Sequence, residues 1–574
     1  MGAALSLLRF VSLVISRIHK TQKDHSTALI DREKKMEEKQ RKLASAAKLE
    51  AWLRAPTHTR VGSIERSKTL LIISVAVYGV VFSILTVLRY YAFRTRAWDL
   101  GIFTQSFWTT SNAGKFFYYT CELVVNPSGS FFGVHFSPIL FLVEPFYWVL
   151  QTPETLLVIQ AFILALAAVP IFKLANEYAG GRTAGLLFST AYLIYPATQY
   201  VNWYDFHVEA FIPLFSAYAI YYLTKEKWPK YLAFILLLLM VQEQTAFVTF
   251  FIGIYIAWKY RSRIISAIKK GRFSENEVII PIITMVISMV WYSFTLWQRN
   301  TFFPINPAAM SGFLGSENFT ILGAKDPLQI PLLIILRPLN ALQALSYDGL
   351  IKLAYLGVLF GPLALFSFKS PSVLIPTIPW FGFSLLSQTL SHHMLGHQYE
   401  GFVVSFIFAA AIFGVRKGFV GKPQHRSTAG SLKQIAAFSL AFFVLFAPFC
   451  LVQTIFFPGF TSIQVGVHER SLTELVKMVP SNTSILTVDH IFPQVSNRMD
   501  AYVVPVVWLN TTIQSIIIDS VNQTVYKVDY ILLDNHTDPV ATSLVLLLLE
   551  SKPQFTLIKS RDNGEILLFR RNSV

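Results

Sequence analysis

The chain has 574 residues, of which 53% are hydrophobic and 14% are charged, and its mean hydropathy is +0.48. Soluble domains carry about a quarter charged residues, so this composition excludes an ordinary soluble protein and places most of the chain in lipid. The net charge of +16 does not indicate nucleic-acid binding, because the basic residues lie mainly between apolar segments, where they act as topology signals.

Residues 1–67 form a polar, basic arm. Within it, Leu5–Ile18 is apolar but interrupted by Arg9 and Arg17, and no small-residue cleavage site follows. We therefore expect an interfacial helix there and not a signal peptide. Asp31–Ala51 has the composition of a charged cytoplasmic helix. The whole arm is predicted to lie in the cytoplasm.

A row of apolar segments follows, each of a length typical of a membrane span or slightly shorter. They are 69–90, 152–174, 182–198, 207–224, 229–241, 245–257, 277–297, 349–368, 371–388, 399–415 and 434–457. These segments predict an all-α polytopic bundle of about eleven transmembrane helices within residues 68–458, with a first external loop at 91–151. The apolar run 136–150 is short and contains two prolines, so we interpret it as a juxtamembrane or re-entrant helix, although a crossing there would invert every later loop.

The orientation follows from the basic loops, because loops rich in Lys and Arg stay on the cytoplasmic side of a membrane. The basic arm and loops 225–230, 259–272 and 416–433 all fall on one side under this assignment. Asn-x-Ser/Thr sequons, which must be external to be glycosylated, occur at Asn318, Asn482, Asn510, Asn522 and Asn535, all on the other side. We predict a multi-pass cell-membrane protein with a cytoplasmic N-terminus and an external C-terminal domain, and the sequons are compatible with an archaeal or eukaryotic cell envelope.

The character of the sequence changes at residue 459. Ser471–Met478 predicts a helix, and short β-type runs follow at 484–488, 502–507 and 530–533. Runs 556–559 and 566–570, separated by Asp562-Asn563-Gly564, predict a hairpin. Residues 459–574 are therefore expected to form a small external α/β domain.

Polar residues embedded in apolar sequence form five clusters, which this topology places at the outer membrane boundary. They are 97–108, 133–138, 202–209, 242–244 and 391–400. Ionisable groups at membrane depth cost several kcal/mol unless they are paired or line a wet cavity, so each cluster is a candidate site. Glu243 is the clearest case because it separates two apolar runs; the plainer interpretation is that it caps a short turn in water.

Arg89, Arg94 and Arg96 lie at the outer end of the first span, against the positive-inside trend. Contact with lipid headgroups would explain them. Alternatively, their guanidinium groups hold a phosphate, for which the arginine fork is well suited. A phosphate bound there would lie beside Asp99.

His135, Asp205 and His207 supply the donor types of a divalent metal site. Asp205 and His207 would point the same way only on an extended segment. Asp205 is equally suited to cap the fourth span, with His207 in its first turn. The sequence contains no Walker loop, Rossmann glycine pattern or Gly-x-Ser-x-Gly elbow, so a nucleotide-driven engine and a serine hydrolase have no support.

Several of these motifs, in this order, resemble a known family of membrane proteins. They are Trp98–Gly101 with Gln105 and Trp108, then His135–Pro138, Asp205–His207, the Glu243 hairpin, His397–Tyr399 and, more faintly, Ile491–Arg498 and Asp529–Asp534. This order resembles the predicted membrane proteins called domain of unknown function 2079, whose layout is similar to the glycosyltransferase C superfamily. That superfamily has many spans, a catalytic acid in the first external loop and lipid-phosphate-linked sugar donors, and Asp99 matches the position of that acid. The chain departs from better-known members in lacking an Asp-x-Asp or Asp-Glu pair in this loop and a Trp-Trp-Asp-type motif in the tail, so metal dependence and acceptor type do not follow.

The resemblance implies transfer of a sugar from a polyprenyl-phosphate carrier at the outer membrane face, with membrane lipids as partners and no nucleic acid. Asp99 and Glu243 are the expected catalytic residues, and Asp99 would act as general base on an acceptor hydroxyl. The expected substrate-binding residues are Arg94, Arg96, Gln105, Trp108, His392, His397, Tyr399 and Glu400. A divalent metal ion at His135, Asp205 and His207 is an optional cofactor.

Two other functions compete with sugar transfer, and the first of them uses the same polar residues. A transporter or flippase of a lipid-linked or small polar substrate would need polar residues through the full depth of the bilayer, ideally in two pseudo-symmetric halves. Here they concentrate near one face, and no internal repeat is detected. A non-catalytic surface scaffold would need only the 459–574 domain. Both alternatives stay open on the sequence.

Overall fold

The computed structural model describes residues 57–307, 316–325, 327–417, 424–450, 462–506 and 514–572. The chain divides into two compact units, Met1–Thr69 and Leu70–Val574, and the features considered below lie in the second. The helices predicted at 5–18 and 31–51 lie outside the described residues.

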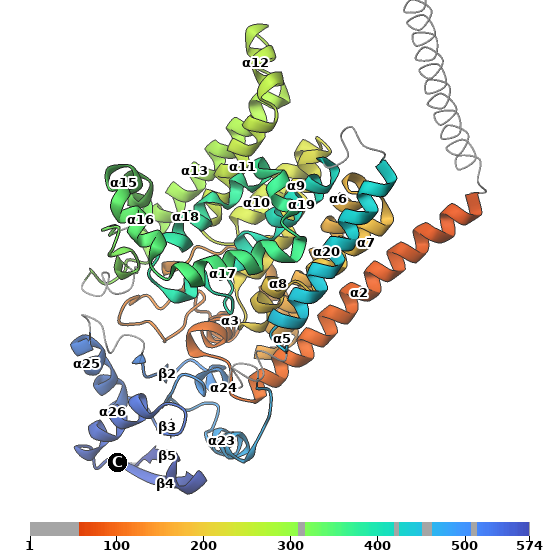
Figure 1. The fold of residues 1–574 in the computed structure, drawn as a ribbon. Coiled ribbons are helices and arrows are strands. Elements are labelled where there is room, and N and C mark those ends of the chain that lie inside the picture. Colours follow the sequence, from red (N-terminus) through yellow and green to blue (C-terminus); the bar gives the residue numbers. More distant parts are fainter. Residues whose placement is uncertain are drawn as a thin grey trace, which may run out of the picture. The chain divides into compact units, whose positions relative to one another are not determined.

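Helices dominate the chain as far as residue 450 (Figure 1). They are α2 (Thr57–Tyr91), α3 (Ile102–Ala113), α4 (Leu140–Val149), α5 (Pro153–Leu166), α6 (Ala168–Tyr178), α7 (Arg182–Leu193), α8 (Pro196–Trp203), α9 (Ile212–Thr224), α10 (Trp228–Leu239), α11 (Thr245–Lys259), α12 (Arg261–Lys269), α13 (Asn276–Phe302), α15 (Ile330–Leu336), α16 (Pro338–Ser346), α17 (Gly349–Phe360), α18 (Ile378–Leu386), α19 (Val404–Lys417) and α20 (Gln424–Phe446). A π-helical turn, η1 (Ala97–Gly101), precedes α3, and several 3-10 turns connect the other helices.

The prediction of about eleven transmembrane helices is wrong for the described residues when continuous helix length is counted. Four helices are long and apolar enough to cross a membrane: Glu65–Tyr91, Pro153–Tyr178, Asn276–Phe302 and Ala429–Phe446. A fifth candidate is the pair Pro338–Ser346 and Gly349–Leu363, which bends by 73°. Shorter apolar helices of 10–17 residues include Val208–Thr224, Trp228–Leu239, Thr245–Lys259 and Pro371–Leu386.

Breaks inside the apolar segments explain this difference. The predicted span 182–198 is divided before Pro196 into α7, of 12 residues, and α8, of 8 residues. The predicted span 349–368 ends its helix at Phe360, before Gly361-Pro362 and two residues with positive φ, Ala364 and Leu365. Proline removes a helical hydrogen bond and constrains the preceding residue, so an apolar run need not be one straight helix. The run at 136–150 forms α4, whose ten residues are too few to span a bilayer.

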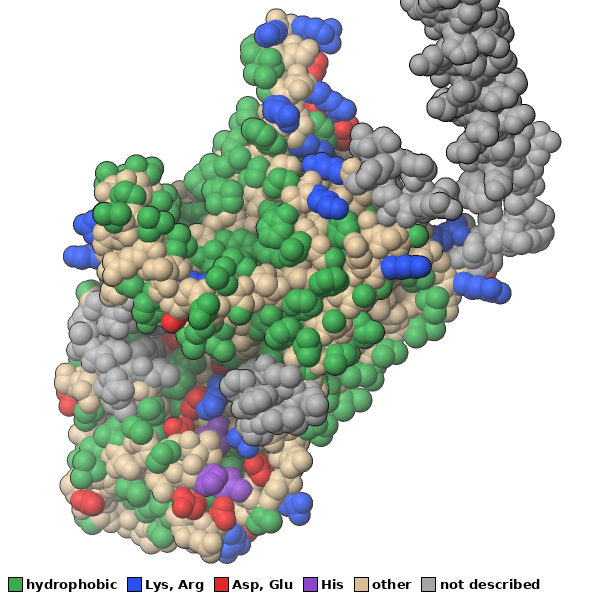
Figure 2. Space-filling view, in the orientation of Figure 1, with side chains coloured by type: hydrophobic (Ala, Val, Ile, Leu, Met, Phe, Trp, Pro, Cys, Tyr) green, Lys and Arg blue, Asp and Glu red, His purple; other side chains and the backbone are tan. Residues whose placement is uncertain are grey.

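The outer surface of the helical part is apolar. Exposed large hydrophobic side chains follow α2 and α13, including Ile72, Ile84, Val286 and Val290. Figure 2 shows hydrophobic side chains over the helical body, Lys and Arg around α12, and acidic and histidine side chains on the C-terminal domain. An apolar surface with polar regions beyond it is the pattern of a protein that crosses a membrane.

The C-terminal domain contains a five-stranded sheet in the order β2-β1-β3-β5-β4. Its elements are α23 (Val467–Met478), β1 (Ile485–Thr487), α24 (Phe492–Val495), β2 (Ala501–Val503), α25 (Gln514–Val525), β3 (Tyr530–Asp534), α26 (Pro539–Glu550), β4 (Phe555–Arg561) and β5 (Ile566–Arg571). Strands β2, β1 and β3 are parallel, whereas β4 and β5 form the predicted antiparallel hairpin, which is confirmed. The apolar run 544–549 lies in α26, where Val545 is buried but Leu547 is 64% exposed.

The carboxyl ends of the parallel strands β1 and β3 meet at one edge of this sheet. Asp489 and His490 follow β1, and Asp534 is the last residue of β3. In open α/β sheets this edge is the usual position of functional side chains. Here it contacts the loop between α2 and α3, because α24 packs on the π turn η1.

Candidate functional site

Asp99 lies in the π turn η1, between the end of α2 and the start of α3. The backbone enters this turn from an extended Arg96 (φ −118°, ψ 153°) and leaves it directly into α3 at Ile102. Isolated π turns are rare and are frequently found at functional sites. The predicted catalytic acid therefore occupies the most irregular part of the first loop.

Two side chains from the segment after α8 donate to the Asp99 carboxylate. His207 Nε2 lies 3.1 Å from Asp99 Oδ1, and the Tyr204 hydroxyl donates to Asp99 Oδ2 over 3.0 Å. The other ring nitrogen of His207 lies 3.1 Å from the Asp205 carbonyl oxygen. Both nitrogens of His207 face oxygen acceptors, so both carry a proton and the ring is an imidazolium. The Asp99 side chain is 13% exposed, which keeps it accessible to a substrate.

Asp99 and His207 hold each other in the charged form. Burial alone would raise the pKa of Asp99, but the hydrogen bond and charge of His207, the hydrogen bond from Tyr204 and the charge of Arg89 lower it below its usual value. Burial alone would lower the pKa of His207, yet the hydrogen bond to Asp99 and the Asp99 charge raise it to about 9. The pair is therefore an ionised carboxylate beside a fixed cation at neutral pH.

This pair predicts a pH-dependent effect of the His207→Gln substitution on stability. The contribution of His207 is fully present below its unfolded-state pKa of about 6.5 and is lost as the pH rises through about 9. The contribution of Asp99 is present above its unfolded-state pKa of about 3.8 and is lost only at lower pH. We expect the variant to unfold at a lower temperature than the wild type near neutral pH and to approach it well above pH 9. A melting-temperature difference that stays constant across thermal scans in detergent through that range would contradict the ion pair.

A buried ion pair lies next to Asp99. Arg89, at the end of α2, pairs with Asp205, and both side chains are nearly inaccessible to solvent. The second carboxylate oxygen of Asp205 accepts from the Arg96 backbone N–H over 2.7 Å. The guanidinium of Arg89 also lies over the Trp203 ring, at 5.4 Å from its centroid. Asp205, on the segment after α8, therefore binds both the end of α2, through Arg89, and the start of the turn that carries Asp99, through the Arg96 backbone.

One buried glutamine fixes the backbone on which Asp205 and His207 lie. The side-chain amide nitrogen of Gln160, in α5, donates to the Asp205 carbonyl over 2.9 Å. Its oxygen accepts from the His207 backbone N–H over 2.7 Å. The segment after α8 is thus held extended, so the side chains of Asp205 and His207 are not placed by a helix.

The structure does not bring His135, Asp205 and His207 together as metal ligands. His135 contacts Glu243, Asp205 is neutralised by Arg89, and His207 has both nitrogens protonated toward oxygen atoms, whereas a metal requires a neutral imidazole. Within the described ranges, no group of three or more His, Cys, Asp or Glu side chains is arranged to hold a metal ion. The residues present therefore do not fit the predicted metal ion.

The two predicted phosphate-binding arginines contact the C-terminal domain. Arg96 Nη1 lies 3.1 Å from Asp489 Oδ2, and Arg94 Nη2 lies 3.8 Å from Glu469 Oε1. The Arg96 side chain is 49% exposed, so it has room for a further anionic partner. Arg89, which the sequence groups with them, is instead committed to Asp205.

Glu243 forms a second polar pair in the turn between α10 and α11. Its Oε1 atom lies 2.9 Å from His135 Nδ1, and its Oε2 atom accepts from the Phe136 backbone N–H over 3.0 Å. The rings of Phe103 and Phe131 contact each other, and Phe103 contacts His207 whereas Phe131 contacts His135. Aromatic side chains thus lie between the two pairs. Glu243 fixes the loop before α4, and its predicted catalytic role stays a prediction.

The fifth polar cluster reaches the site through aromatic contacts. The His397 ring lies edge-on to Tyr204 at 4.9 Å between centroids, and Tyr204 stacks on His207 at 5.2 Å. Tyr399 contacts the His397 ring at 6.0 Å and stacks on Trp380. The structure thus brings parts of the first, third and fifth clusters together around Asp99.

The remaining predicted substrate-binding residues are partly or fully buried. His392 is buried, with Nδ1 2.8 Å from the Ser387 hydroxyl, and Glu400 is 1% exposed. Trp108 is half-buried against the core. Gln105 is fully buried, its amide nitrogen contacts three carbonyl oxygens of residues 498–501, and its oxygen accepts from Thr120. The hydrogen-bonding groups of Gln105 are thus occupied within the protein, and its predicted substrate-binding role stays a prediction.

Tyr204, Gln160 and Asp489 belong to the site but were not among the predicted site residues. Tyr204 lies inside the third polar cluster, where its position three residues before a histidine is a signal that the sequence offers. Asp489 directly follows a predicted strand, which is a typical place for a functional carboxylate. Its contact with residues 96 and 97 joins positions almost 400 apart, and no local pattern predicts such a contact.

Comparison with known proteins gives the following matches. No curated protein matches the chain. Among solved structures, ArnT from Cupriavidus metallidurans in the apo state is similar at 12% identity and a TM-score of 0.36, over 86% of this chain and 98% of that chain. The archaeal oligosaccharyltransferase AglB from Archaeoglobus fulgidus, in complex with an inhibitory peptide and a dolichol-phosphate, is similar at 13% identity and a TM-score of 0.37, over 87% of this chain and 74% of that chain.

Similarity at this level leaves the activity of the chain to be argued from its own residues. The family model described as "Predicted membrane protein (DUF2079)" matches residues 89–560, which include every residue of the site around Asp99. This match confirms the family to which the sequence motifs pointed. The chain belongs to the DUF2079 family of membrane proteins.

Proposed function

We propose that this protein transfers a sugar from a polyprenyl-phosphate-linked donor to an acceptor hydroxyl at the outer membrane face, with Asp99 as general base. The single observation that carries the proposal is the Asp99 carboxylate, which is held ionised by His207 and Tyr204 yet is still partly exposed. A carboxylate fixed by two donors, with lone pairs to spare on both oxygens, is suited to accept a proton from an alcohol.

The position of Asp99 favours a substrate anchored in lipid. Helix α2 contains a candidate span that ends at Tyr91, and η1 begins six residues later at Ala97. A sugar attached to a membrane lipid would be presented at this level. The half-exposed guanidinium of Arg96 lies three residues before Asp99 and would contact the phosphate of such a donor.

The chemical step balances with the residues present. The acceptor oxygen forms a bond to the anomeric carbon while its proton moves to Asp99. The bond between the anomeric carbon and the phosphate oxygen breaks, and its electron pair leaves with the lipid phosphate. The low pKa of Asp99 is compatible with this role, because an alcohol becomes much more acidic as its oxygen bonds to carbon. His207 stays protonated and keeps the carboxylate oriented.

The distribution of charged side chains supports the outer face as the location of the site. Lys and Arg gather around α12, whereas the acidic and histidine side chains gather on the C-terminal domain that contacts the Asp99 loop (Figure 2). Basic loops mark the cytoplasmic side. On this basis we place α12 in the cytoplasm, and Asp99 with the C-terminal domain outside.

The test uses the purified protein in liposomes with a polyprenyl-phosphate donor that carries a radiolabelled sugar, and a panel of sugar, lipid and peptide acceptors. We expect a labelled product and an equal amount of free polyprenyl phosphate. A donor that moves between leaflets without loss of its sugar would favour the flippase and overturn the proposal. Absence of both transfer and movement would favour the scaffold.

A further inference from the structure

We infer that Asp489 of the C-terminal domain is a positioning residue that holds the π turn carrying Asp99 in its reactive shape. The inference deepens the proposed function and rests on it for its catalytic meaning, but the geometry that supports it stands independently. It assigns the C-terminal domain a direct part in assembling the site.

The carboxylate of Asp489 contacts both the backbone and the side chain at the entrance to η1. Its Oδ1 atom accepts from the Ala97 backbone N–H over 2.7 Å, and its Oδ2 atom accepts from Arg96 Nη1 over 3.1 Å. The N–H groups in the first turn of a helix have no partner within the helix. Asp489 satisfies one of them with a charge-assisted hydrogen bond, which is stronger than a neutral one.

The neighbouring N–H is satisfied from the other side of the loop. The Arg96 backbone N–H donates to Asp205 Oδ2 over 2.7 Å. Two consecutive N–H groups, at residues 96 and 97, are thus held by two carboxylates, one from the helical part and one from the C-terminal domain. Asp99, two residues further on, has little freedom to move unless one of these bonds is broken.

Packing at the end of η1 supports the same arrangement. A side chain on Gly101 would place its first carbon 2.6 Å from the Phe492 ring, so only glycine lets Phe492 approach this closely. The Gln494 amide donates to the Tyr90 carbonyl over 2.7 Å, and Gln105 binds the carbonyls of residues 498–501. The segment after β1 therefore follows the first loop from the end of α2 into α3.

The residue that follows Asp489, His490, is paired with strand β3. The Nε2 atom of His490 lies 2.8 Å from Asp534 Oδ2, and the Nε2 atom of His468 lies 3.0 Å from the same oxygen. Nδ1 of His468 lies 2.5 Å from Asp562 Oδ2. The hydrogen bonds and charges of these carboxylates raise the pKa of both histidines against the effect of burial. These charged pairs join the segment after β1, which contains Asp489, to the end of β3 and the start of α23.

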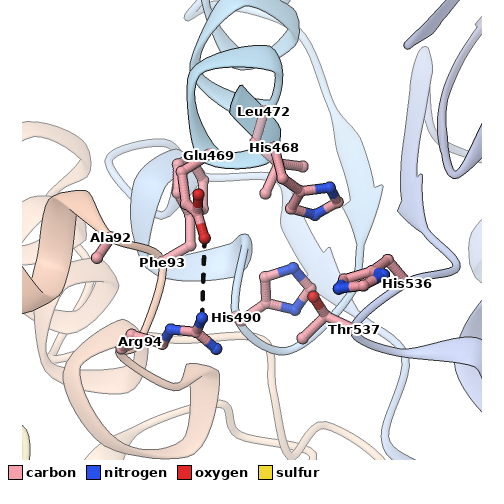
Figure 3. Close-up of a pocket in the computed structure, with 9 residues that line it drawn as sticks. All are labelled: Ala92, Phe93, Arg94, His468, Glu469, Leu472, His490, His536 and Thr537. Carbon is pink, nitrogen blue, oxygen red and sulfur yellow. Dashed lines mark ion pairs between the residues drawn. The ribbon is translucent and has the colours of Figure 1, made fainter. Parts of the chain in front are cut away.

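A cavity of about 240 Å³ lies between the segment that leads from α2 to η1 and the C-terminal domain. Figure 3 shows His468, His490 and His536 on one wall of this cavity and the Arg94–Glu469 pair on the other. Residues of the loop entrance and of the C-terminal domain line it together. The loop thus contacts the domain through individual hydrogen bonds and ion pairs around a cavity, as well as through packing. Each hydrogen bond or ion pair can be removed by a single substitution.

The environment of Asp489 gives the test a pH signature. Its burial raises its pKa to about 6, against the charge of Arg96 and the Ala97 N–H, which lower it. The charged and titratable groups that face it are Arg96, Asp99, Asp538 and Cys121. Protonation below about pH 6 would remove its charge and weaken both hydrogen bonds.

The experiment measures hydrogen exchange of the 97–102 amides in the full-length protein in detergent, without substrate. We expect Asp489→Ala to raise this exchange about 10- to 100-fold, and Asp489→Asn, which keeps an oxygen acceptor, to raise it less. The wild type should show faster exchange at pH 5 than at pH 7 after correction for intrinsic rates, and Asp489→Asn should lose this difference. The control is Asp519→Asn on exposed α25, which should match the wild type.

Unchanged exchange at 97–102 in Asp489→Ala, with β1 and β3 still protected, would overturn the inference. If β1 and β3 also lose protection, the domain has unfolded, and Arg96→Ala, which removes only the side-chain bond, becomes the deciding variant. Its 97–102 exchange should rise, and no rise would again overturn the inference. In the transfer assay, Asp489→Asn should lower kcat with little change in KM for the donor. The wild-type rate should fall between pH 7 and pH 5, whereas the rate of Asp489→Asn should not. Since exchange needs no substrate, failure of the transfer assay would refute the proposed function and leave the exchange result standing.

Discussion

Asp99→Asn is expected to lower the rate of sugar transfer by a factor of roughly 10²–10⁴, the usual contribution of a positioned general base. The substitution keeps the size of the side chain, and the amide oxygen can still accept from His207 or Tyr204. It removes the negative charge that takes up the acceptor proton and that stabilises the His207 imidazolium. The measurement is the initial rate of labelled product formation at saturating donor.

The matched control for this variant is Asp519→Asn, the same chemical change on the exposed face of α25. It should retain the wild-type rate. The melting temperature of Asp99→Asn should show that the protein is still folded. A folded Asp99→Asn protein that turns over at the wild-type rate would remove Asp99 from the mechanism.

Arg89→Met is expected to have the largest effect on stability, a loss of about 3–5 kcal/mol in the free energy of unfolding. The guanidinium of Arg89 neutralises Asp205, and the Asp205 side chain has no exposed area. Removing Arg89 would leave a buried carboxylate without its cation, and the methionine cannot supply the missing hydrogen bond. The free energy can be followed by titration with a denaturing detergent in mixed micelles.

The double variant Arg89→Met with Asp205→Asn separates the cost of an unpaired charge from the loss of packing. Because no charge remains buried, it should recover a substantial part of the stability lost in Arg89→Met. Asp205→Asn alone should also be destabilised, because it leaves Arg89 buried without its carboxylate. Losses that add in the double variant would show that the two side chains are not coupled.

Composition and hydropathy predict the class of the protein and the position of its apolar segments, but not the number of straight spans. The run 182–198 is mostly apolar, yet it forms α7 and α8, which are separated before Pro196. Similarly, Gly361-Pro362 ends α17 inside an apolar run. Hydropathy averages over a window, so a single proline or a residue with positive φ does not change the average although it ends the helix. The C-terminal hairpin was predicted correctly because its turn residues are local.

The candidate site was predicted in its parts but not in its pairs. Asp99, His207 and His397 are single polar residues in apolar surroundings. Because placing such residues there costs free energy, the sequence alone indicates them as candidate site residues. Their partners depend on the fold. The sequence suggests that Asp205 and His207 share a metal, whereas the structure pairs Asp205 with Arg89 and His207 with Asp99. Likewise, the sequence assigns Arg94 and Arg96 to a phosphate, whereas their acidic contacts lie in a domain that begins more than 350 residues later.

The central claim is that Asp99 acts as the base and that His207 acts through it. A double-mutant cycle of the transfer rate tests this claim most directly, with Asp99→Asn, His207→Gln and the two combined. We predict that the double variant is no slower than Asp99→Asn alone, because His207 has nothing left to orient once the carboxylate is gone. Rate losses that multiply in the double variant would contradict the claim, since His207 would then contribute to transfer independently of Asp99.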